Sequence, residues 1–200
     1  MEWLATLGRT LGFSLAAGVN LYATVAILGL ASRYQWVSLP DQFKAFDNPW
    51  IIGIAGALYV VEFVADKVPW VDSIWDSVHT LIRPVGGAVI AVASLGEASP
   101  TLTALIALLG GVVSAGSHAT KAGTRVAANT SPEPFSNWFL SLAEDAFVIG
   151  LSFITLKFPL LALGVSVVIL VLMVLLARSI WKWLTKGARG AEGAEGAIGA

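Results

Sequence analysis

LLALGVSVVILVLMVLLA, residues Leu160–Ala177, is the stretch that decides the fold class. Its 18 residues carry no charge, and a helix needs about 20 apolar residues to cross the hydrocarbon core of a bilayer. With its flanks included, the stretch predicts a membrane-spanning helix over about Phe158–Trp181.

The composition of the whole chain agrees with this interpretation. Its 200 residues are 56% hydrophobic and only 12% charged, and the mean hydropathy is +0.79. A soluble domain carries about 25% charged residues, so an ordinary cytosolic enzyme and a disordered chain are excluded. The net charge of −1 gives no basic field for a nucleic acid. Cysteine is absent, which excludes disulfides and thiolate chemistry.

Hydropathy predicts an all-α membrane protein with about six transmembrane helices. The predicted spans are Thr10–Ala31, Pro49–Ala65, Ser73–Leu95, Thr101–Ala127, Asn137–Leu156 and Phe158–Trp181. The alternative for the first is a signal peptide, but its apolar run is long for one and its basic region is only Arg9. Tryptophan prefers the headgroup layer, and all eight tryptophans fall near predicted span ends: Trp3, Trp36, Trp50, Trp70, Trp75, Trp138, Trp181 and Trp183.

Lysine and arginine predict the orientation. With six spans both termini share one side, which would hold nine of the twelve basic residues; the other side would hold only Arg33, Lys44 and Lys157. Cytoplasmic loops are rich in lysine and arginine, so both termini are predicted to be cytoplasmic. Residues 186–200 are rich in Gly, Ala and Glu and are predicted to be a disordered cytoplasmic tail.

The two halves of the chain resemble each other. AAGVNLYAT at Ala16–Thr24 matches SAGSHATKA at Ser114–Ala122, and Asn48–Pro69 is similar to Ser136–Pro159. The similarity predicts a 3+3 inverted repeat, with residues 1–97 and 98–185 as its three-helix halves and a site where they meet. The alternative is chance similarity between two apolar stretches rich in Gly and Ala.

Ionisable residues recur within the predicted spans at helical spacing. Steps of three and four residues lie on one face of a helix, and charges inside a span cost about 2.5–3.5 kcal/mol each on insertion scales. They are expected to face one another or water. The predicted binding-site residues are Glu62, Asp66, Asp72, Asp76, His79, Arg83, His118, Lys121, Arg125, Glu144 and Asp145.

Acids outnumber bases in this set. With Glu133 and Lys67 added, seven acids face four bases, so some carboxylates are expected to bind protons or a cation. Two structural alternatives stand beside this. Asp72, Asp76 and Glu133 could be solvated at the interface, or the buried charges could be an ion-pair network that only holds the helices together.

Small residues allow two interpretations as well. Glycine pairs in RPVGG at Arg83–Gly87 and LLGG at Leu108–Gly111 indicate either a hinge or close helix packing. A stripe of small residues at Gly111, Ala115, Ala119 and Gly123 fits an internal contact or the face of a homo-oligomer.

Two long motifs carry a family resemblance. VEFVADKVPWVDSIWDSVHTLIRP at Val61–Pro84 and SHATKAGTRVAANTSPEPFSNWFLSLAED at Ser117–Asp145 resemble the bacterial membrane proteins grouped as domain of unknown function 4126. The resemblance covers about residues 8–180. It implies a multi-pass protein of the bacterial inner (plasma) membrane and supplies no activity.

Three functions follow from these patterns. The leading hypothesis is a small transporter or channel-like protein whose carboxylate and histidine cluster binds a proton or cation, with a small ion or anionic solute as partner. The second is an intramembrane enzyme in which Asp72, Asp76 and His79 hold a divalent ion against a lipid headgroup. The third is a membrane scaffold with a structural charge network. No catalytic signature is present, so an enzyme is the less favoured hypothesis, and no cofactor is predicted.

Overall fold

The computed structural model describes the backbone of residues 1–129 and 134–198, and the side chains of 1–128 and 135–182. Contacts divide the chain into two compact units, Met1–Ser166 and Val167–Ala200. The elements, in order, are α1 (Glu2–Val19), α2 (Leu21–Arg33), the 3₁₀ helix η1 (Asp41–Phe46), α3 (Pro49–Ala65), α4 (Pro69–Leu95), α5 (Pro100–Asn129), α6 (Pro134–Lys157) and α7 (Pro159–Ile198). The prediction for Glu133 lies outside the described residues, as do the side chains of the predicted tail.

Four helices among the described residues are long and apolar enough to cross a membrane. They are Pro69–Leu95, Pro100–Ala128, Phe135–Lys157 and Pro159–Lys182, and two shorter apolar helices cover Leu21–Arg33 and Pro49–Ala65. The outward faces are apolar: Leu81 and Val85 of α4 and Leu108 and Val112 of α5 are exposed, whereas the acidic and basic side chains of these two helices are buried. This inverted distribution is that of a helical membrane protein, because lipid accepts an apolar surface.

The predicted first span is not one helix. Asn20 adopts an extended backbone and separates α1 from α2, and its side chain accepts a hydrogen bond from the Ala23 backbone N–H at 2.9 Å. Asparagine competes for backbone hydrogen bonds and favours helix starts. The expected continuous helix Thr10–Ala31 is therefore wrong, and the chain turns at Asn20.

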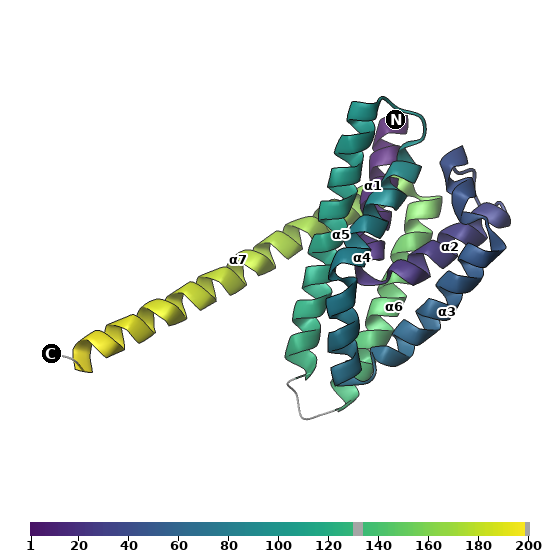
Figure 1. Ribbon diagram of the computed structural model, residues 1–200. Coiled ribbons are helices and arrows are strands. Elements are labelled where there is room, and N and C mark those ends of the chain that lie inside the picture. Colours follow the sequence, from purple (N-terminus) through teal and green to yellow (C-terminus); the bar gives the residue numbers. More distant parts are fainter. Residues whose placement is uncertain (130–133, 199–200) are drawn as a thin grey trace. The chain divides into compact units, whose positions relative to one another are not determined.

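Helices α1 and α2 form a hairpin, and its two outer ends lie at the same end of the first unit. A Cβ atom built on Gly8 of α1 would lie 1.9 Å from the carbonyl oxygen of Pro159. Just beyond α2, Lys157 Nζ donates to the Trp36 carbonyl at 2.7 Å. Both outer ends of the hairpin therefore lie where α6 ends and α7 begins, and the junction of α1 and α2 lies deeper in the bundle (Figure 1).

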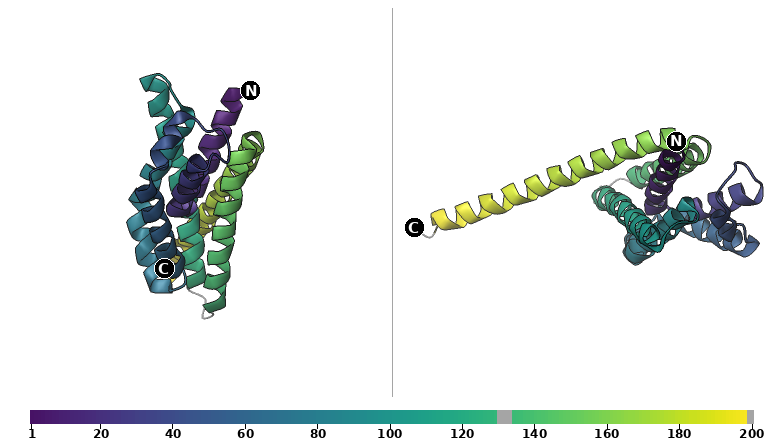
Figure 2. Two further views of the ribbon diagram at one scale, coloured as in Figure 1. Left: turned by 90° about the vertical axis from the view of Figure 1, so that its right-hand side faces the viewer. Right: turned by 90° about the horizontal axis from the view of Figure 1, so that it is seen from above.

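The hairpin is enclosed by protein. Helix α1 contacts α4, α5 and α6, and every residue from Thr10 to Val19 is buried. Seen from above, purple α1 lies between green α6 and the teal pair α4 and α5 (Figure 2). Phe13, Leu28, Phe43 and Ile90 form the centre of the hydrophobic core. A backbone break is tolerated in a membrane protein where it is surrounded by protein.

Helices α4 and α5 cross closely because small residues meet there. A Cβ atom added to Gly87 would lie 2.4 Å from Ser114 Cβ, and one added to Gly110 would lie 2.3 Å from Ala91 Cβ. The glycine pairs thus lie in a close helix contact. In the small-residue stripe of α5, Ala119 is exposed and a Cβ atom on Gly123 would meet nothing within 4 Å.

Most tryptophans lie on the surface near helix ends. Trp50 and Trp70 follow the prolines that begin α3 and α4, and both are exposed. Trp75 differs, because its ring stacks on His79 with centroids 4.5 Å apart. The side chain of Trp183 lies outside the described residues.

Candidate functional site

Four helices bring the predicted ionisable residues to one buried region. Glu62 and Asp66 come from the end of α3, Asp72, Asp76, His79 and Arg83 from α4, His118, Lys121 and Arg125 from α5, and Glu144 and Asp145 from α6. All are buried except the Glu144 side chain, which is 12% exposed. We call these eleven residues the charge network.

Arg83 lies at the inner end of the network and is fully buried. Its Nη2 donates to Glu62 Oε1 at 2.6 Å. Its Nη1 donates to His118 Nδ1 at 2.7 Å and to the Gly18 carbonyl at 3.3 Å, and Asp76 Oδ1 lies 3.3 Å from the same nitrogen. The guanidinium therefore joins α3, α4 and α5 to the carboxyl end of α1, where a positive charge is favourable.

Lys121 occupies the centre of the network. Its Nζ lies 3.1 Å from Glu62 Oε1, 3.1 Å from Asp66 Oδ2 and 3.7 Å from Glu144 Oε2. One ammonium thus faces three carboxylates from two helices. A buried charge is tolerated when it is paired and hydrogen-bonded in this way.

Arg125 lies at the outer end, near the end of α5. It pairs with Glu144 at 2.5 Å and with Asp66 at 3.0 Å, and Asp72 Oδ1 lies 3.9 Å from its Nε. Nη1 also donates to the backbone carbonyls of Asp66 at 2.8 Å and Asn137 at 3.4 Å. All five N–H groups of this guanidinium therefore donate hydrogen bonds to acceptors at the end of α3 and on α6.

The geometry assigns the proton on each histidine. A guanidinium can only donate, so His118 Nδ1 accepts from Arg83, and its Nε2–H donates to Thr80 Oγ1 at 3.2 Å. His79 Nδ1–H donates to the Trp75 carbonyl at 2.7 Å, so its Nε2 accepts from the Tyr22 hydroxyl at 2.8 Å. Each neutral ring thus accepts at one nitrogen and donates from the other.

Acids remain in excess. Six carboxylates share three cations, and Glu62 Oε2 and Asp145 Oδ2 are buried with no hydrogen-bond partner among the described residues. Lys67 does not make up the difference: its Nζ donates to the Phe63 carbonyl at 2.7 Å and to Ser141 Oγ at 3.2 Å. Burial lowers the pKa of this ammonium, and the negative charges of Asp145 and Asp66 oppose the shift.

Some partners in the network were not predicted. Tyr22 and Thr80 hold the two histidines, and the backbone carbonyl of Gly18 holds Arg83. Tyr22 lies two residues after Asn20 and Thr80 directly follows His79, so proximity in sequence was the available signal. Nothing in the sequence marks a glycine carbonyl as an acceptor.

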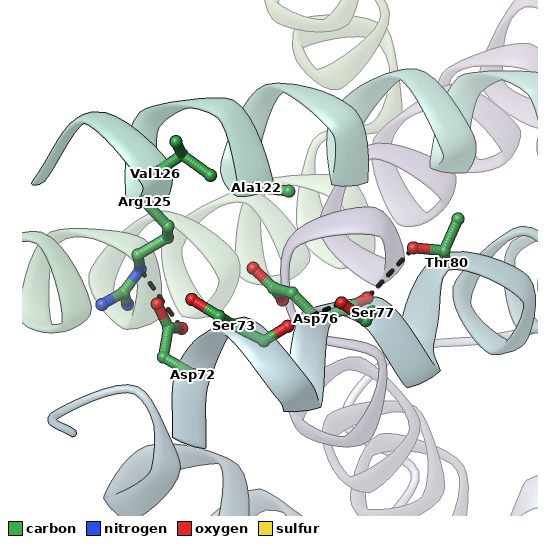
Figure 3. Close-up of a pocket in the computed structure, with 8 residues that line it drawn as sticks. All are labelled: Asp72, Ser73, Asp76, Ser77, Thr80, Ala122, Arg125 and Val126. Atoms are coloured by element: carbon green, nitrogen blue, oxygen red, sulfur yellow. Dashed lines mark hydrogen bonds and ion pairs between the residues drawn. The ribbon is translucent and has the colours of Figure 1, made fainter. Parts of the chain in front are cut away.

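A polar pocket opens beside the network between α4 and α5. It has a volume of about 180 Å³ and is lined by Asp72, Ser73, Asp76, Ser77, Thr80, Ala122, Arg125 and Val126. In Figure 3 the two aspartates of α4 point toward α5, where Arg125 meets Asp72. Ser73, Ser77 and Val126 are exposed, so the pocket reaches the surface.

The comparisons with known proteins place the chain in a family. No curated protein and no solved structure matches it. Residues 7–179 match the family model described as Domain of unknown function (DUF4126), and this match includes every residue of the charge network. The chain therefore belongs to the family of domain of unknown function 4126.

Proposed function

We propose that this protein is a channel-like membrane protein that moves protons, with the charge network as its proton-binding site. One observation carries the proposal: six acidic side chains and only three basic ones are packed together inside the helical bundle. In a medium of low dielectric constant the surplus carboxylates cannot all stay ionised. Some must hold protons, and a shared proton can move among them.

Protons fit the surplus better than a metal ion does. Within the part of the chain that the structure describes, no group of three or more His, Asp or Glu side chains is arranged to hold a metal. In the enzyme hypothesis Asp72, Asp76 and His79 would bind a divalent ion, but both ring nitrogens of His79 are already hydrogen-bonded, to the Trp75 carbonyl and the Tyr22 hydroxyl.

The charge network is long enough along α4 to form part of a proton path. Asp72 and Arg83 are 11 residues apart on α4, a distance of about 16 Å at 1.5 Å per residue. The outer end contains Asp66, Asp72 and Arg125, and the inner end contains Arg83 and the two histidines.

Buried hydroxyl groups extend the polar region beyond the inner end. Ser14 Oγ lies 3.5 Å from the Gly87 carbonyl. The hydroxyls of Thr10 and Ser152 are buried with no hydrogen-bond partner among the described residues. Buried polar groups without protein partners commonly hold ordered water, and water among these hydroxyls would continue the path along α1.

The hairpin of α1 and α2 supports a channel-like form. A broken helix at membrane depth is typical of sites where polar backbone faces a cavity. The break at Asn20 lies close to Arg83, because Arg83 donates a hydrogen bond to the carbonyl of Gly18, two residues before Asn20. The predicted 3+3 inverted repeat requires three crossings in each half. If α1 and α2 form a re-entrant hairpin, the first half has only two crossings, α3 and α4, so the proposed channel does not need two equivalent halves that rock against each other.

The proposed location is a bacterial inner membrane crossed by α3 to α7. Basic residues are more frequent after the apolar run of α7, at Arg178, Lys182, Lys186 and Arg189, than before it, at Lys157, so the C-terminus is placed in the cytoplasm. A re-entrant hairpin then puts the N-terminus on the opposite side, whereas six crossings would put both termini in the cytoplasm.

Proton flux into liposomes tests the proposal. The full chain is reconstituted in phosphatidylcholine vesicles that contain a pH-sensitive dye, and a pH gradient is imposed while valinomycin and potassium hold the membrane potential constant. We expect the protein to dissipate the gradient faster than empty vesicles do. The double variant with Glu62→Gln and Glu144→Gln should lose most of this flux, because it removes two proton-binding groups and keeps their shape.

A matched control separates function from folding. The double variant Asp41→Asn with Glu97→Gln neutralises two exposed acids outside the network and should conduct like the unmodified chain. Elution from a sizing column and tryptophan emission verify that each variant is folded. Absence of flux above that of empty vesicles, or equal flux from both double variants, would overturn the proposal and favour a scaffold with a structural charge network.

A further inference from the structure

We propose that Asp145 is the residue through which the charge network takes up and releases protons, with Lys67 as its movable counter-ion. The proposal rests on the proposed function, because Asp145 belongs to the network. It adds a named proton-exchanging residue and a movement: Lys67 is bound to Ser141 while Asp145 is protonated, and it shifts to Asp145 when the proton leaves.

Asp145 is the acid that the ion pairs of the network leave out. Only 7% of the residue is exposed, and its Oδ2 is buried with no hydrogen-bond partner among the described residues. The three cations pair with the other carboxylates: Arg83 with Glu62 and Asp76, Lys121 with Glu62, Asp66 and Glu144, and Arg125 with Asp66, Asp72 and Glu144. None of these ion pairs includes Asp145. A buried carboxyl group without a paired cation is most stable in its neutral form, which keeps the proton.

Charged groups on neighbouring elements act on Asp145 through space. The negative charges of Asp66 and Glu62 oppose its ionisation, and the positive charges of Lys121 and Lys67 favour it. Lys121 already faces three carboxylates, so Lys67 is the base that an ionised Asp145 can recruit. The other titratable neighbour is Tyr59 of α3. Helices α1 and α2 also pack on α6, but their charged side chains lie toward its opposite end, where Gly8 meets Pro159 and Trp36 meets Lys157; they are Glu2, Arg9 and Arg33.

Lys67 is bound one helical turn from Asp145, on the same face of α6. Its Nζ donates to the Phe63 carbonyl at 2.7 Å and to Ser141 Oγ at 3.2 Å, and it lies 3.0 Å from the centroid of the Phe63 ring. Residues four apart on a helix have Cβ atoms about 5–6 Å apart. Side chains on a helix also lean toward its N-terminus, which brings the Asp145 carboxyl group toward Ser141. Rotation about the bonds of a flexible lysine stem can cover this step.

Lys67 also connects the buried acid to the surface. It is half-buried in the turn between α3 and α4, and its Nζ lies 6.0 Å from the ring of Trp138, an exposed residue near the start of α6. The ends of α3 and α5 and the starts of α4 and α6 lie at the same end of the first unit (Figure 1). An ionised Asp145 that is paired with Lys67 therefore has a route along this side chain for proton exchange with water.

Proton release is balanced within this pair and water. The O–H bond of the Asp145 carboxyl group breaks, its electron pair stays on the oxygen, and a water molecule takes the proton. The Lys67 ammonium then leaves Ser141 Oγ and donates to the carboxylate, so the charge created by ionisation is paired. Uptake of a proton reverses both movements.

Infrared difference spectroscopy on the full chain in phosphatidylcholine vesicles tests the proposal. The carbonyl stretch of protonated carboxyl groups is followed as the pH is raised, and the component that is lost in Asp145→Asn reports this residue. In Lys67→Met the midpoint pH of that component should rise by about 1–3 units, because a nearby opposite charge favours the ionised form by this amount. Lys67→Arg keeps the positive charge and should return the midpoint toward that of the unmodified chain.

Two further variants separate the movement from a general effect of charge. Lys44→Met is the matched control, because Lys44 is an exposed lysine that pairs with Asp41 outside the network, and it should leave the midpoint unchanged. Ser141→Ala removes the resting partner of Lys67, which then pairs with Asp145 more readily, so the midpoint should fall. Elution from a sizing column and tryptophan emission verify that each variant is folded.

Failure of this proposal can be told from failure of the proposed function. It is overturned if Asp145→Asn removes no component of the band, if Lys67→Met and Lys44→Met have the same midpoint, or if Ser141→Ala leaves the midpoint unchanged, even where proton flux into vesicles is observed. The expected shifts without any proton flux would retain the exchange between Lys67 and Asp145 and reject proton movement across the membrane.

Discussion

Removal of Arg83 should harm the protein far more than neutralisation of the acid it binds. Arg83→Met deletes one of three cations that serve six carboxylates, so the surplus of acids rises from three to four, whereas Glu62→Gln lowers it to two. The methionine also leaves the Gly18 carbonyl and His118 Nδ1 without a donor. In contrast, the side-chain carbonyl introduced by Glu62→Gln can still accept from Arg83 and Lys121.

The expected magnitudes differ severalfold. Breaking a buried charge pair by removing one partner costs about 3–5 kcal/mol, and 1 kcal/mol shifts the Tm of a chain of this size by about 2–4 °C. Arg83→Met should therefore lower Tm by about 6–20 °C. Exchange of a charged for a neutral hydrogen bond costs about 1 kcal/mol, so Glu62→Gln should lower Tm by only about 2–4 °C.

Tryptophan emission during a thermal ramp in detergent measures both shifts. Arg33→Met is the matched control, because Arg33 pairs with Asp47 at 3.4 Å while its side chain is 43% exposed, and exposed pairs contribute about 0–1 kcal/mol. The reasoning is refuted if Arg83→Met is as stable as Arg33→Met. It also fails if Glu62→Gln proves the more damaging of the two network changes.

Two further predictions concern the fold. Gly87→Val should separate α4 from α5 and lower Tm markedly, because the new Cβ atom would lie 2.4 Å from Ser114 Cβ, whereas Gly123→Val, which meets nothing within 4 Å, should not; equal Tm values would contradict the close crossing. Since the chain has no cysteine, Glu2→Cys and Glu97→Cys can each be labelled with a membrane-impermeant maleimide in oriented vesicles. A re-entrant hairpin predicts that both label from the same side, and labelling from opposite sides would show that α1 and α2 together cross the membrane once, as a single span.

Much of the candidate site could be predicted from helical spacing alone. Asp72, Asp76, His79 and Arg83 share one face because steps of three and four residues return to the same side of a helix, and that face is buried in the structure. Helix packing, which spacing along one helix does not encode, decided which acid meets which base. Lys121 thus faces Glu62 and Asp66 of α3, and Arg125 reaches Glu144 of α6.

The hairpin of α1 and α2 is a feature that hydropathy could not predict. A window average over Thr10–Ala31 registers an apolar run and gives one asparagine little weight, so it predicts a single span. The chain can turn at Asn20 because α4, α5 and α6 surround α1 and because the side chain caps α2. Both conditions depend on neighbours that are distant in sequence.

Sequence by itself determined the helical membrane class, the family, and the faces on which charges gather, because composition, motifs and the 3.6-residue period are local properties of the chain. Tertiary structure alone decided the turn between α1 and α2 at Asn20, the pairing within the charge network and the polar pocket between α4 and α5. Each of these depends on distances between atoms of different helices, and those distances exist only once the small residues of α4 and α5 have packed together.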